Sequence, residues 1–387
     1  MKIVEIREKK IPFSSSISNS VISFSEMTGS IVAVITDVVR DGKPVVGLGF
    51  NSIGRYAQSN IIRERLIPRI MKANPVDVLN DKGTNFSPEK ISKIMMTNEK
   101  PGGHGDRAHA VGAIEMALWD AVAKIEEKPL WKYLSDTYNS GKYDRKVFTY
   151  AAGGYYYPGK SIEALKDEIK SYLDRGFTKV KIKIAGASLK EDMERIEAVI
   201  KLVGDGSSVC VDANGRLSLE NALAYAHAMQ DYNLMWYEEP GDPLDYQLNA
   251  VVASEYYAPI ATGENLFSMQ DIRNLLRYGG MRSQRDFIQM DCGLAYGLTE
   301  FMKTLKMMDT MGWTPRRCVP HGGHQFCLNI AAGLQLGGNE CYPDVFQPFG
   351  GFGDKVEIID GYATLPEVPG IGIEYKPNLY KEFKVLL

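Results

Sequence analysis

The chain has 387 residues, of which 44% are hydrophobic and 24% charged, the usual composition of a globular protein. Its 45 basic residues nearly balance its 48 acidic residues, so a net charge of −3 gives no basic excess for nucleic acid. This composition excludes a disordered chain, a coiled coil and a collagen-like fibre, and the length predicts two or three structural units.

The cellular context is predicted from the cysteines and from the absence of long apolar segments. Five cysteines are scattered without a CxxC pair, which favours free thiols in a reducing compartment over a disulfide framework. The charged N-terminus does not read as a signal peptide, and no apolar run reaches the length of a membrane span. We therefore expect a soluble, cytoplasmic protein with no membrane or nucleic-acid partner.

Residues 1–145 are predicted to form an α+β domain. Alternating apolar residues at 2–9 predict a strand, and two apolar runs within 31–50 flank Asp41-Gly42 as a β-hairpin does. Helical spacing of apolar residues follows at 60–73 and 108–127.

From residue 146 to residue 345, short apolar strands alternate with amphipathic helices, such as those expected at 161–176 and 190–204. This alternation predicts a parallel sheet, and seven or eight such units close into a barrel. Strands are expected at 147–151, 179–184, 208–213, 234–239, 259–264, 286–291 and 317–321. Residues 346–387 return to strands and turns and are predicted to fold back on the first domain.

Acidic side chains stand at the ends of three successive barrel strands. Asp212, Glu238 and Glu264 follow one another at intervals of 26 residues, which is one strand–helix unit. A single acid after a strand is usually a helix N-cap, but three in register should converge at the mouth of the barrel, where active sites of this fold lie. Three carboxylates that leave positions for water and substrate suit Mg²⁺.

Two further groups with chemical potential lie on other strands. Lys181 and Lys183 are two residues apart and so point to the same face of a buried strand; each is expected to have a lowered pKa and one to act as a base. The alternative is a solvated lysine pair. Asp291 and His321 end two later strands, and a carboxylate beside an imidazole makes a general acid or base, although a lone histidine is more often a core residue.

These residues lie in motifs that resemble the enolase superfamily, mandelate racemase subgroup, and within it the D-tartrate dehydratase type. The resemblance spans essentially the whole chain. The motifs are KIK (181–183), VDANG (211–215), EEP (238–240), TGEN (262–265), MDCG (290–293), PHGGHQ (320–325), NEKPGGHG (98–105) and GGNECYPDVFQPFGG (337–351). The resemblance implies a modified TIM barrel, (β/α)7β, with an α+β capping domain completed by the C-terminal segment.

The resemblance also implies a role for each site residue. Asp212, Glu238 and Glu264 would bind one Mg²⁺, as the strand-end pattern also indicates. Lys183 would remove the α-proton, Lys181 would hold a carboxylate oxygen, and His321, oriented by Asp291, would protonate the leaving hydroxyl. Substrate contacts are expected from Lys100, which would read the distal end of the substrate, and from Asn19, Arg55, Asn214, His324 and Glu340.

The implied reaction is dehydration of D-tartrate to oxaloacetate by a homo-oligomeric hydro-lyase. The alternatives are an aldonate dehydratase acting on arabinonate or gluconate, a racemase of the same fold, and a barrel that only binds ligands. Ile53 favours the aldonate. It lies in the loop 51–56, which in this family can cap the substrate, and an apolar side chain there is a poor partner for the second carboxylate of a diacid.

Overall fold

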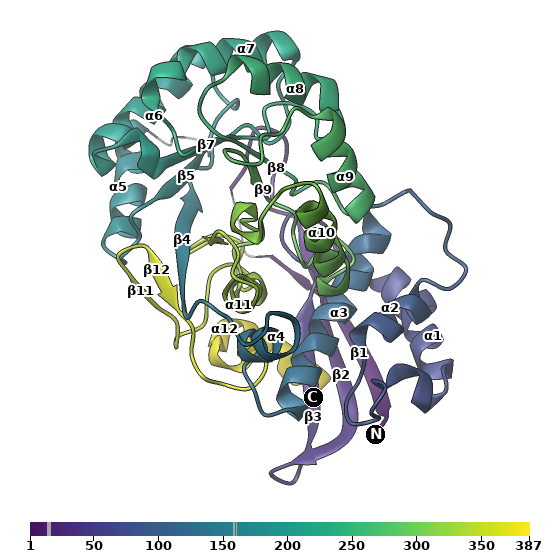
Figure 1. Ribbon diagram of the computed structural model, residues 1–387. Helices are drawn as coiled ribbons and strands as arrows, with labels where there is room; N and C mark the ends of the chain where they lie inside the picture. Colours follow the sequence, from purple (N-terminus) through teal and green to yellow (C-terminus); the bar gives the residue numbers. More distant parts are fainter. Residues whose placement is uncertain (14–16, 158, 160) are drawn as a thin grey trace.

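The computed structural model describes residues 1–13, 17–157, 159 and 161–387. A three-stranded sheet near the N-terminus lies beside a larger sheet that closes on itself (Figure 1). Within the described ranges, no helix combines the length and the apolar character needed to cross a lipid bilayer. All five cysteines are buried and free.

The N-terminal sheet is antiparallel, with β1 (Ile3–Pro12), β2 (Thr28–Arg40) and β3 (Lys43–Phe50) in that order. The predicted hairpin is confirmed, since β2 and β3 pair across Asp41 and Gly42, whose φ angles of 49° and 75° suit a tight hairpin turn. The helices of this part are η1 (Ile61–Leu66), α1 (Ile67–Lys72), η2 (Pro75–Val78), α2 (Pro88–Met95), α3 (Asp106–Ile125) and α4 (Leu130–Tyr138).

Helix α3 lies directly on β3 because two glycines of the strand allow a close approach. A Cβ atom at Gly47 would lie 2.0 Å from the carbonyl oxygen of Ala117, and one at Gly49 would lie 2.5 Å from that of Ala113. Both distances are far inside van der Waals contact, so any larger residue would push the helix off the sheet. The other side of α3 meets the barrel through α10 (Leu298–Thr310).

Glu115 joins α3 to α10 and is fully buried. Its Oε2 accepts hydrogen bonds from Trp119 Nε1 at 3.1 Å and from the backbone N–H of Thr299 at 2.9 Å. Thr299 lies in the first turn of α10, which begins after Gly297 without a side-chain cap of its own. Glu115 therefore satisfies a helix-terminal donor from the neighbouring domain. Burial raises the pKa of Glu115 to about 7.

We expect Glu115 to make stability depend on pH. Its pKa is higher in the folded protein than the usual 4.5, so its contribution is complete below pH 4.5 and is lost as the pH rises through 7. Relative to the Glu115→Gln variant, the free energy of unfolding of the native chain should fall by about 2–3 kcal/mol between pH 5 and pH 8. Urea unfolding at both pH values measures this, with the exposed Glu163→Gln as control. Equal pH profiles for native chain and variant would contradict the expectation.

The barrel is built from parallel strands, and β10 pairs with β4 to close it. Its strands are β4 (Lys146–Gly153), β5 (Val180–Lys183), β6 (Val209–Asp212), β7 (Trp236–Glu238), β8 (Ile260–Thr262), β9 (Phe287–Ile288) and β10 (Asn339–Cys341). Its helices are α5 (Ile162–Leu173), α6 (Leu189–Val203), α7 (Leu219–Ala228), α8 (Tyr246–Glu255), α9 (Met269–Tyr278), α10 and α11 (Gln325–Gly333). Short 3-10 turns precede β6, β7 and residue 318: η3 (Gly206–Ser208), η4 (Gln230–Tyr232) and η5 (Pro315–Arg317).

The strand expected at 317–321 is reduced to a single parallel bridge between Ile288 and Cys318. Prolines at 315 and 320 flank the bridge, and proline has no N–H to donate to a ladder. The backbone still continues the barrel, because the N–H of His321 donates to the carbonyl of Gln289 at 3.2 Å. Counting this segment, the described part of the barrel has eight strands and seven helices, so the predicted modified TIM barrel is confirmed.

The C-terminal segment divides between the two sheets (Figure 1). Strand β12 (Tyr362–Thr364) pairs antiparallel with β11 (Glu357–Ile359) and with the first half of β4, so this hairpin extends the barrel sheet. Beyond η6 (Ile373–Tyr375), helix α12 (Pro377–Phe383) contacts β2, and η7 (Lys384–Leu386) contacts β1. The division of the chain at residues 145 and 345 stays a prediction.

Candidate active site

The structure brings together the three acids expected at the strand ends. Asp212 and Glu238 are paired neighbours on β6 and β7, and Glu264 follows β8 by two residues. Oxygen atoms of the three carboxylates all lie within 4.8 Å of one another. Asp212 and Glu238 are fully buried, and Glu264 is close to buried.

The electrostatics of this carboxylate cluster fit a hard divalent cation. Burial and the nearby Asp212 raise the pKa of Glu238 to about 8. The Oε2 atom of Glu264 is buried and makes no hydrogen bond with a described residue. Buried like charges of this kind are costly unless a positive charge offsets them. The cluster offers only oxygen donors, which are the ligands that Mg²⁺ prefers.

Both lysines of β5 point into the barrel and are 1% and 3% exposed. Lys183 Nζ is paired with Asp212 Oδ2, while Lys181 Nζ lies 2.5 Å from Glu238 Oε1 and 2.7 Å from Glu340 Oε1. The solvated lysine pair is therefore wrong. The expected lowering of their pKa values is also wrong: burial does act in that direction, but these carboxylates outweigh it and raise the pKa of both lysines.

Asp291 and His321 form the expected dyad. His321 Nδ1 donates to Asp291 Oδ2 at 2.8 Å, and His321 Nε2 lies 3.9 Å from Glu264 Oε2. Burial opposes a charge on His321, but Glu264 and the bond to Asp291 outweigh burial and raise its pKa to about 9. In the metal-free structure these contacts favour the imidazolium form of His321, with Nδ1–H held by Asp291 and Nε2 facing Glu264.

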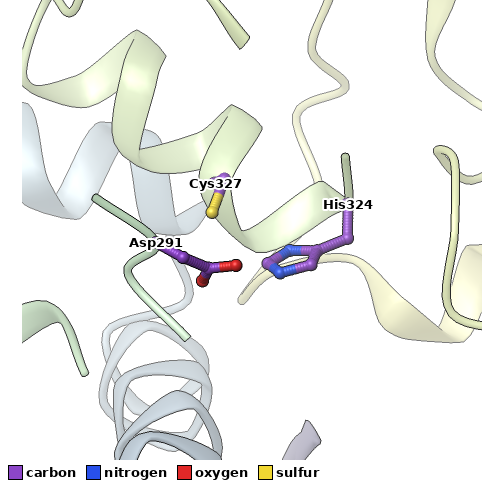
Figure 2. Close-up of side chains that lie close together, drawn as sticks. All are labelled: Asp291, His324 and Cys327. Atoms are coloured by element: carbon purple, nitrogen blue, oxygen red, sulfur yellow. The ribbon is translucent and has the colours of Figure 1, made fainter. Parts of the chain in front are cut away.

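A second group with metal-ligand chemistry shares Asp291 with this dyad, and Figure 2 shows its three side chains lying close together. Atoms of Asp291, His324 and Cys327 lie within 4.8 Å of one another. Asp291 already accepts a hydrogen bond from His321. Burial raises the pKa of Cys327 well above the usual value, so its sulfur is a protonated thiol. This thiol donates weakly to the carbonyl of His321. These hydrogen bonds engage Asp291 and Cys327, whereas Nδ1 of His324 is buried without a hydrogen-bond partner among the described residues.

Ser52 links the capping domain to the dyad and was not predicted. Its Oγ donates to Asp291 Oδ2 at 2.6 Å and lies 2.9 Å from His324 Nε2, so the proton on that nitrogen points to Ser52. Burial lowers the pKa of His324 to about 4, which keeps its ring neutral. His324 was expected to contact the substrate; in the structure it bonds the side chain of Ser52 and does not line the cavity described next, so that contact stays a prediction.

A cavity of about 750 Å³ opens above the cluster. Lys183, Glu264 and His321 line it together. Of the expected substrate contacts, Asn19, Arg55 and Asn214 also line it, whereas Glu340 lies deeper, beside Lys181. Arg55 donates to Asn265 Oδ1. Asn19 is held in its own loop by the N–H groups of residues 21 and 22, and Asn214 Oδ1 is buried without a hydrogen-bond partner among the described residues.

Lys100 does not line this cavity in the structure, so its assignment to the distal end of the substrate stays a prediction. The side chain is exposed, on a loop that turns at Asn98 and at glycines with positive φ. Arg107 fixes this loop over the start of α10 by donating to the carbonyl of Lys100 at 3.1 Å and to Tyr296 Oη at 2.9 Å. The path of the loop could not be read from its sequence.

Two more residues at the site carry signals that were not used: Glu239, which contacts Asn265 of the cavity wall, and Tyr155. Glu239, the second acid of the EEP motif, is buried and accepts both bonds from Asn265 Nδ2, at 2.8 and 3.0 Å. Burial and the nearby Glu264 raise the pKa of Glu239 well above the usual value. Tyr155 lines the cavity, and its ring lies 5.1 Å from Lys183 Nζ. Its position just after a barrel strand was the available signal.

The sequence matches the family "Enolase C-terminal domain-like" over residues 164–379 and the family "Mandelate racemase / muconate lactonizing enzyme, N-terminal domain" over residues 20–135. The two matched families correspond to the barrel and to the capping sheet with its helices. The chain therefore belongs to the mandelate racemase/muconate lactonizing enzyme family of the enolase superfamily.

Several relatives are acid-sugar dehydratases. The chain is 30% identical over 304 residues to arabinonate dehydratase of Saccharolobus solfataricus, covering 76% of each protein. It is 28% identical over 351 residues to L-talarate/galactarate dehydratase of Salmonella typhimurium, covering 88% of this chain and 80% of that protein. It is also similar to the crystal structure of L-talarate dehydratase from Polaromonas sp. JS666 with Mg and L-glucarate, with a TM-score of 0.77 and 26% identity over 95% and 92% of the two chains.

Proposed function

We propose that this protein is a Mg²⁺-dependent acid-sugar dehydratase, a hydro-lyase that removes water from a hydroxy acid. The observation that carries the proposal is that a basic group, an acidic group and a carboxylate cluster meet in one cavity. Lys183 and His321 approach that cavity from well-separated strands, and Glu264 lies beside His321. The crystallised relative that holds Mg and L-glucarate supports the choice of ion and the class of ligand.

The first chemical step is loss of the α-proton. Asp212, Glu238 and Glu264 would hold Mg²⁺, which when bound supplies positive charge against the second negative charge that a substrate carboxylate gains. Lys181, buried beside Glu238, adds positive charge at the same place. When Asp212 binds an ion, its attraction to the Lys183 ammonium becomes weaker. The effect of Asp212 that raises the pKa of Lys183 is therefore reduced. Lys183 can then accept the proton as a neutral amine.

The second step is loss of the β-hydroxyl. His321 presents Nε2 to the cavity while Asp291 holds Nδ1, so the imidazolium can give a proton to the departing oxygen. After the α-proton has moved to Lys183 and the β-hydroxyl has left as water at His321, the remaining molecule is an enol. The enol ketonises to a 2-oxo acid. Lys183 then returns its proton to solvent, and His321 regains one.

D-Tartrate is the substrate that the sequence motifs favour, and the product would be oxaloacetate. Incubation with Mg²⁺ and D-tartrate is expected to yield oxaloacetate, detected by NADH oxidation with malate dehydrogenase, and EDTA should abolish the product. L-Tartrate, arabinonate and gluconate are tested in parallel. An absence of oxaloacetate would refute the tartrate assignment, whereas the absence of any 2-oxo acid from the whole panel would refute the dehydratase.

An aldonate is the second candidate, and two observations favour it. Lys100, the cation expected at the distal end of a diacid, lies outside the cavity. Ile22, Phe24 and Ile53 give part of the cavity wall an apolar surface that suits a carbon chain better than a second carboxylate. A 2-keto-3-deoxy acid formed from arabinonate would establish this candidate, and α-deuterium uptake without dehydration would indicate a racemase.

A further inference from the structure

A serine from the capping domain stands between a histidine and the carboxylate of the dyad. Ser52, Asp291 and His324 are all fully buried. Ser52 Oγ donates to Asp291 Oδ2 at 2.6 Å and lies 2.9 Å from His324 Nε2. Because a carboxylate can only accept, Ser52 gives its single proton to Asp291, and its oxygen accepts the proton of His324 Nε2.

Both oxygens of Asp291 are engaged. Oδ1 accepts the backbone N–H groups of Gly293 and Leu294 at 2.6 and 3.2 Å. Oδ2 accepts from Ser52 and, at 2.8 Å, from His321 Nδ1. Hydrogen bonds to an ionised carboxylate are stronger than those between neutral groups, so these four bonds fix the carboxylate firmly. Oδ2 is the atom that holds His321 in place, and Ser52 shares it.

The ring of His324 depends on Ser52 for its hydrogen bonding within the described ranges. Nε2 bonds Ser52, whereas Nδ1 is buried without a partner there. Figure 2 shows the imidazole pointing toward the carboxylate of Asp291, and atoms of the two side chains lie within 4.8 Å of each other. A buried donor that loses its acceptor costs free energy. Without the serine hydroxyl, the N–H of His324 would therefore turn to Asp291 Oδ2, the acceptor that His321 uses.

The backbone leaves room for this arrangement at Gly322, which lies between the two histidines in the sequence. A Cβ atom at Gly322 would lie 2.8 Å from each of three polar atoms: Ser52 Oγ, Asp291 Oδ2 and His324 Nε2. These distances are shorter than van der Waals contact, so any side chain at this position would displace all three atoms. The separation of His324 from Asp291 by the serine hydroxyl is thus built into the packing.

We infer that Ser52 is a positioning residue for loss of the β-hydroxyl, because its hydroxyl keeps His324 away from Asp291. Asp291 is then left to hold His321 alone. The inference rests on the function proposed above, in which His321 is the acid. Ser52 does not line the cavity, and its hydroxyl bonds only Asp291 and His324 among the described residues. Removal of the α-proton by Lys183 should therefore not depend on Ser52.

The first test separates the two chemical steps, at saturating Mg²⁺ and with D-tartrate or, if that acid is not turned over, arabinonate. Ser52→Ala should lower kcat for dehydration by about 10–100-fold, because a small misplacement of a reacting group can cost that much. Exchange of the substrate α-proton with D₂O should stay close to the native rate. The matched control is Ser30→Ala, which removes another fully buried serine of the capping domain, one that accepts from the N–H of Gln58. It should change neither rate.

A double variant tests whether His324 causes the loss. Ser52→Ala/His324→Leu removes the competing donor with a side chain of similar volume, so Asp291 is again left to His321. It should dehydrate about 3-fold faster or more than Ser52→Ala, because residues of one hydrogen-bond network couple in this way. A general loss of packing predicts the opposite order. A double variant no faster than Ser52→Ala would overturn the inference, and so would a Ser52→Ala variant in which both rates fall together or neither falls.

A proton NMR signal tests the same point without metal or substrate. The Nδ1–H of His321, bonded to Asp291, should give a far-downfield resonance that is missing from His321→Asn. Ser52→Ala should shift this resonance and speed its exchange with solvent, whereas Ser30→Ala should leave it in place. An unchanged resonance in Ser52→Ala would overturn the inference. A native chain that makes no 2-oxo acid and exchanges no α-proton would refute the dehydratase, and this resonance would still decide whether Ser52 positions His321. If the double variant fails to fold, the resonance and the rates of Ser52→Ala decide.

Discussion

Lys183→Ala is expected to lower kcat for dehydration by about 10³-fold or more, because it removes the group proposed to take the α-proton. The deletion also leaves Asp212 without its partner in the metal-free protein, where Lys183 and Asp212 form a buried ion pair. For this reason kcat is measured at saturating Mg²⁺, and folding is checked by circular dichroism. Lys190→Ala, which removes an exposed lysine at the start of α6, should leave kcat unchanged.

His321→Asn separates the two proposed steps. We expect a similar loss of dehydration, about 10²–10⁴-fold, because the leaving hydroxyl lacks its acid. Lys183 remains in place, so the variant should still exchange the substrate α-proton with D₂O, which NMR detects, whereas Lys183→Ala should not. His227→Asn on the exposed side of α7 is the control. Retained dehydration in either active-site variant would refute the roles assigned to these residues.

Glu264→Gln is expected to weaken Mg²⁺ binding by about 100-fold or more. Changing a residue that only supports a metal ligand costs about 10–100-fold in metal affinity, and removing a charged ligand itself should cost at least as much. Glu264 is the best choice of the three acids because its Oε2 makes no hydrogen bond with a described residue. The change also removes a charge that raises the pKa of His321, so the metal affinity is the primary readout. Calorimetric titration with Mg²⁺ measures the affinity, and dehydratase activity at low Mg²⁺ should fall with it.

The same variant should be more stable than the native chain without metal, because Glu264 is one of the charges that raise the pKa of buried Glu238. Mg²⁺ should then raise the Tm of the native chain but have little effect on Glu264→Gln. A variant that binds Mg²⁺ as tightly as the native chain would refute the metal assignment. A variant that is less stable without metal would instead indicate a structural role for Glu264.

The parts of the site that lie on regular strands could be predicted, because one strand–helix unit of constant length places its last residue at the same edge of the barrel. Asp212, Glu238 and Glu264 follow that rule, and so does the pairing of His321 with Asp291. The fold could be predicted for the same reason, since the alternation of strands and helices extends over most of the chain.

What could not be predicted depends on contacts across the fold. The pKa values of Lys181 and Lys183 are set by carboxylates on other strands. In the sequence, the neighbours of each lysine are only the other lysine and apolar residues, so these carboxylates could not be foreseen. The position of the Lys100 loop could not be predicted, because contacts with Arg107 and Tyr296 hold it and no repeating pattern does. The strand at 317–321 was overestimated because the flanking prolines were not weighed against its apolar residues.

The hydrogen bond from Ser52 to Asp291 joins a residue just past β3 to the dyad at the far side of the barrel mouth. The proposed acid, His321, is therefore positioned by both halves of the molecule, because Asp291 comes from the barrel and Ser52 from the capping domain. A lineage that exchanges capping domains to change its substrate range must carry a hydroxyl at this position along with the new loops. Under the proposed function, the hydroxyl that holds the dyad and several residues that line the cavity would then be replaced together.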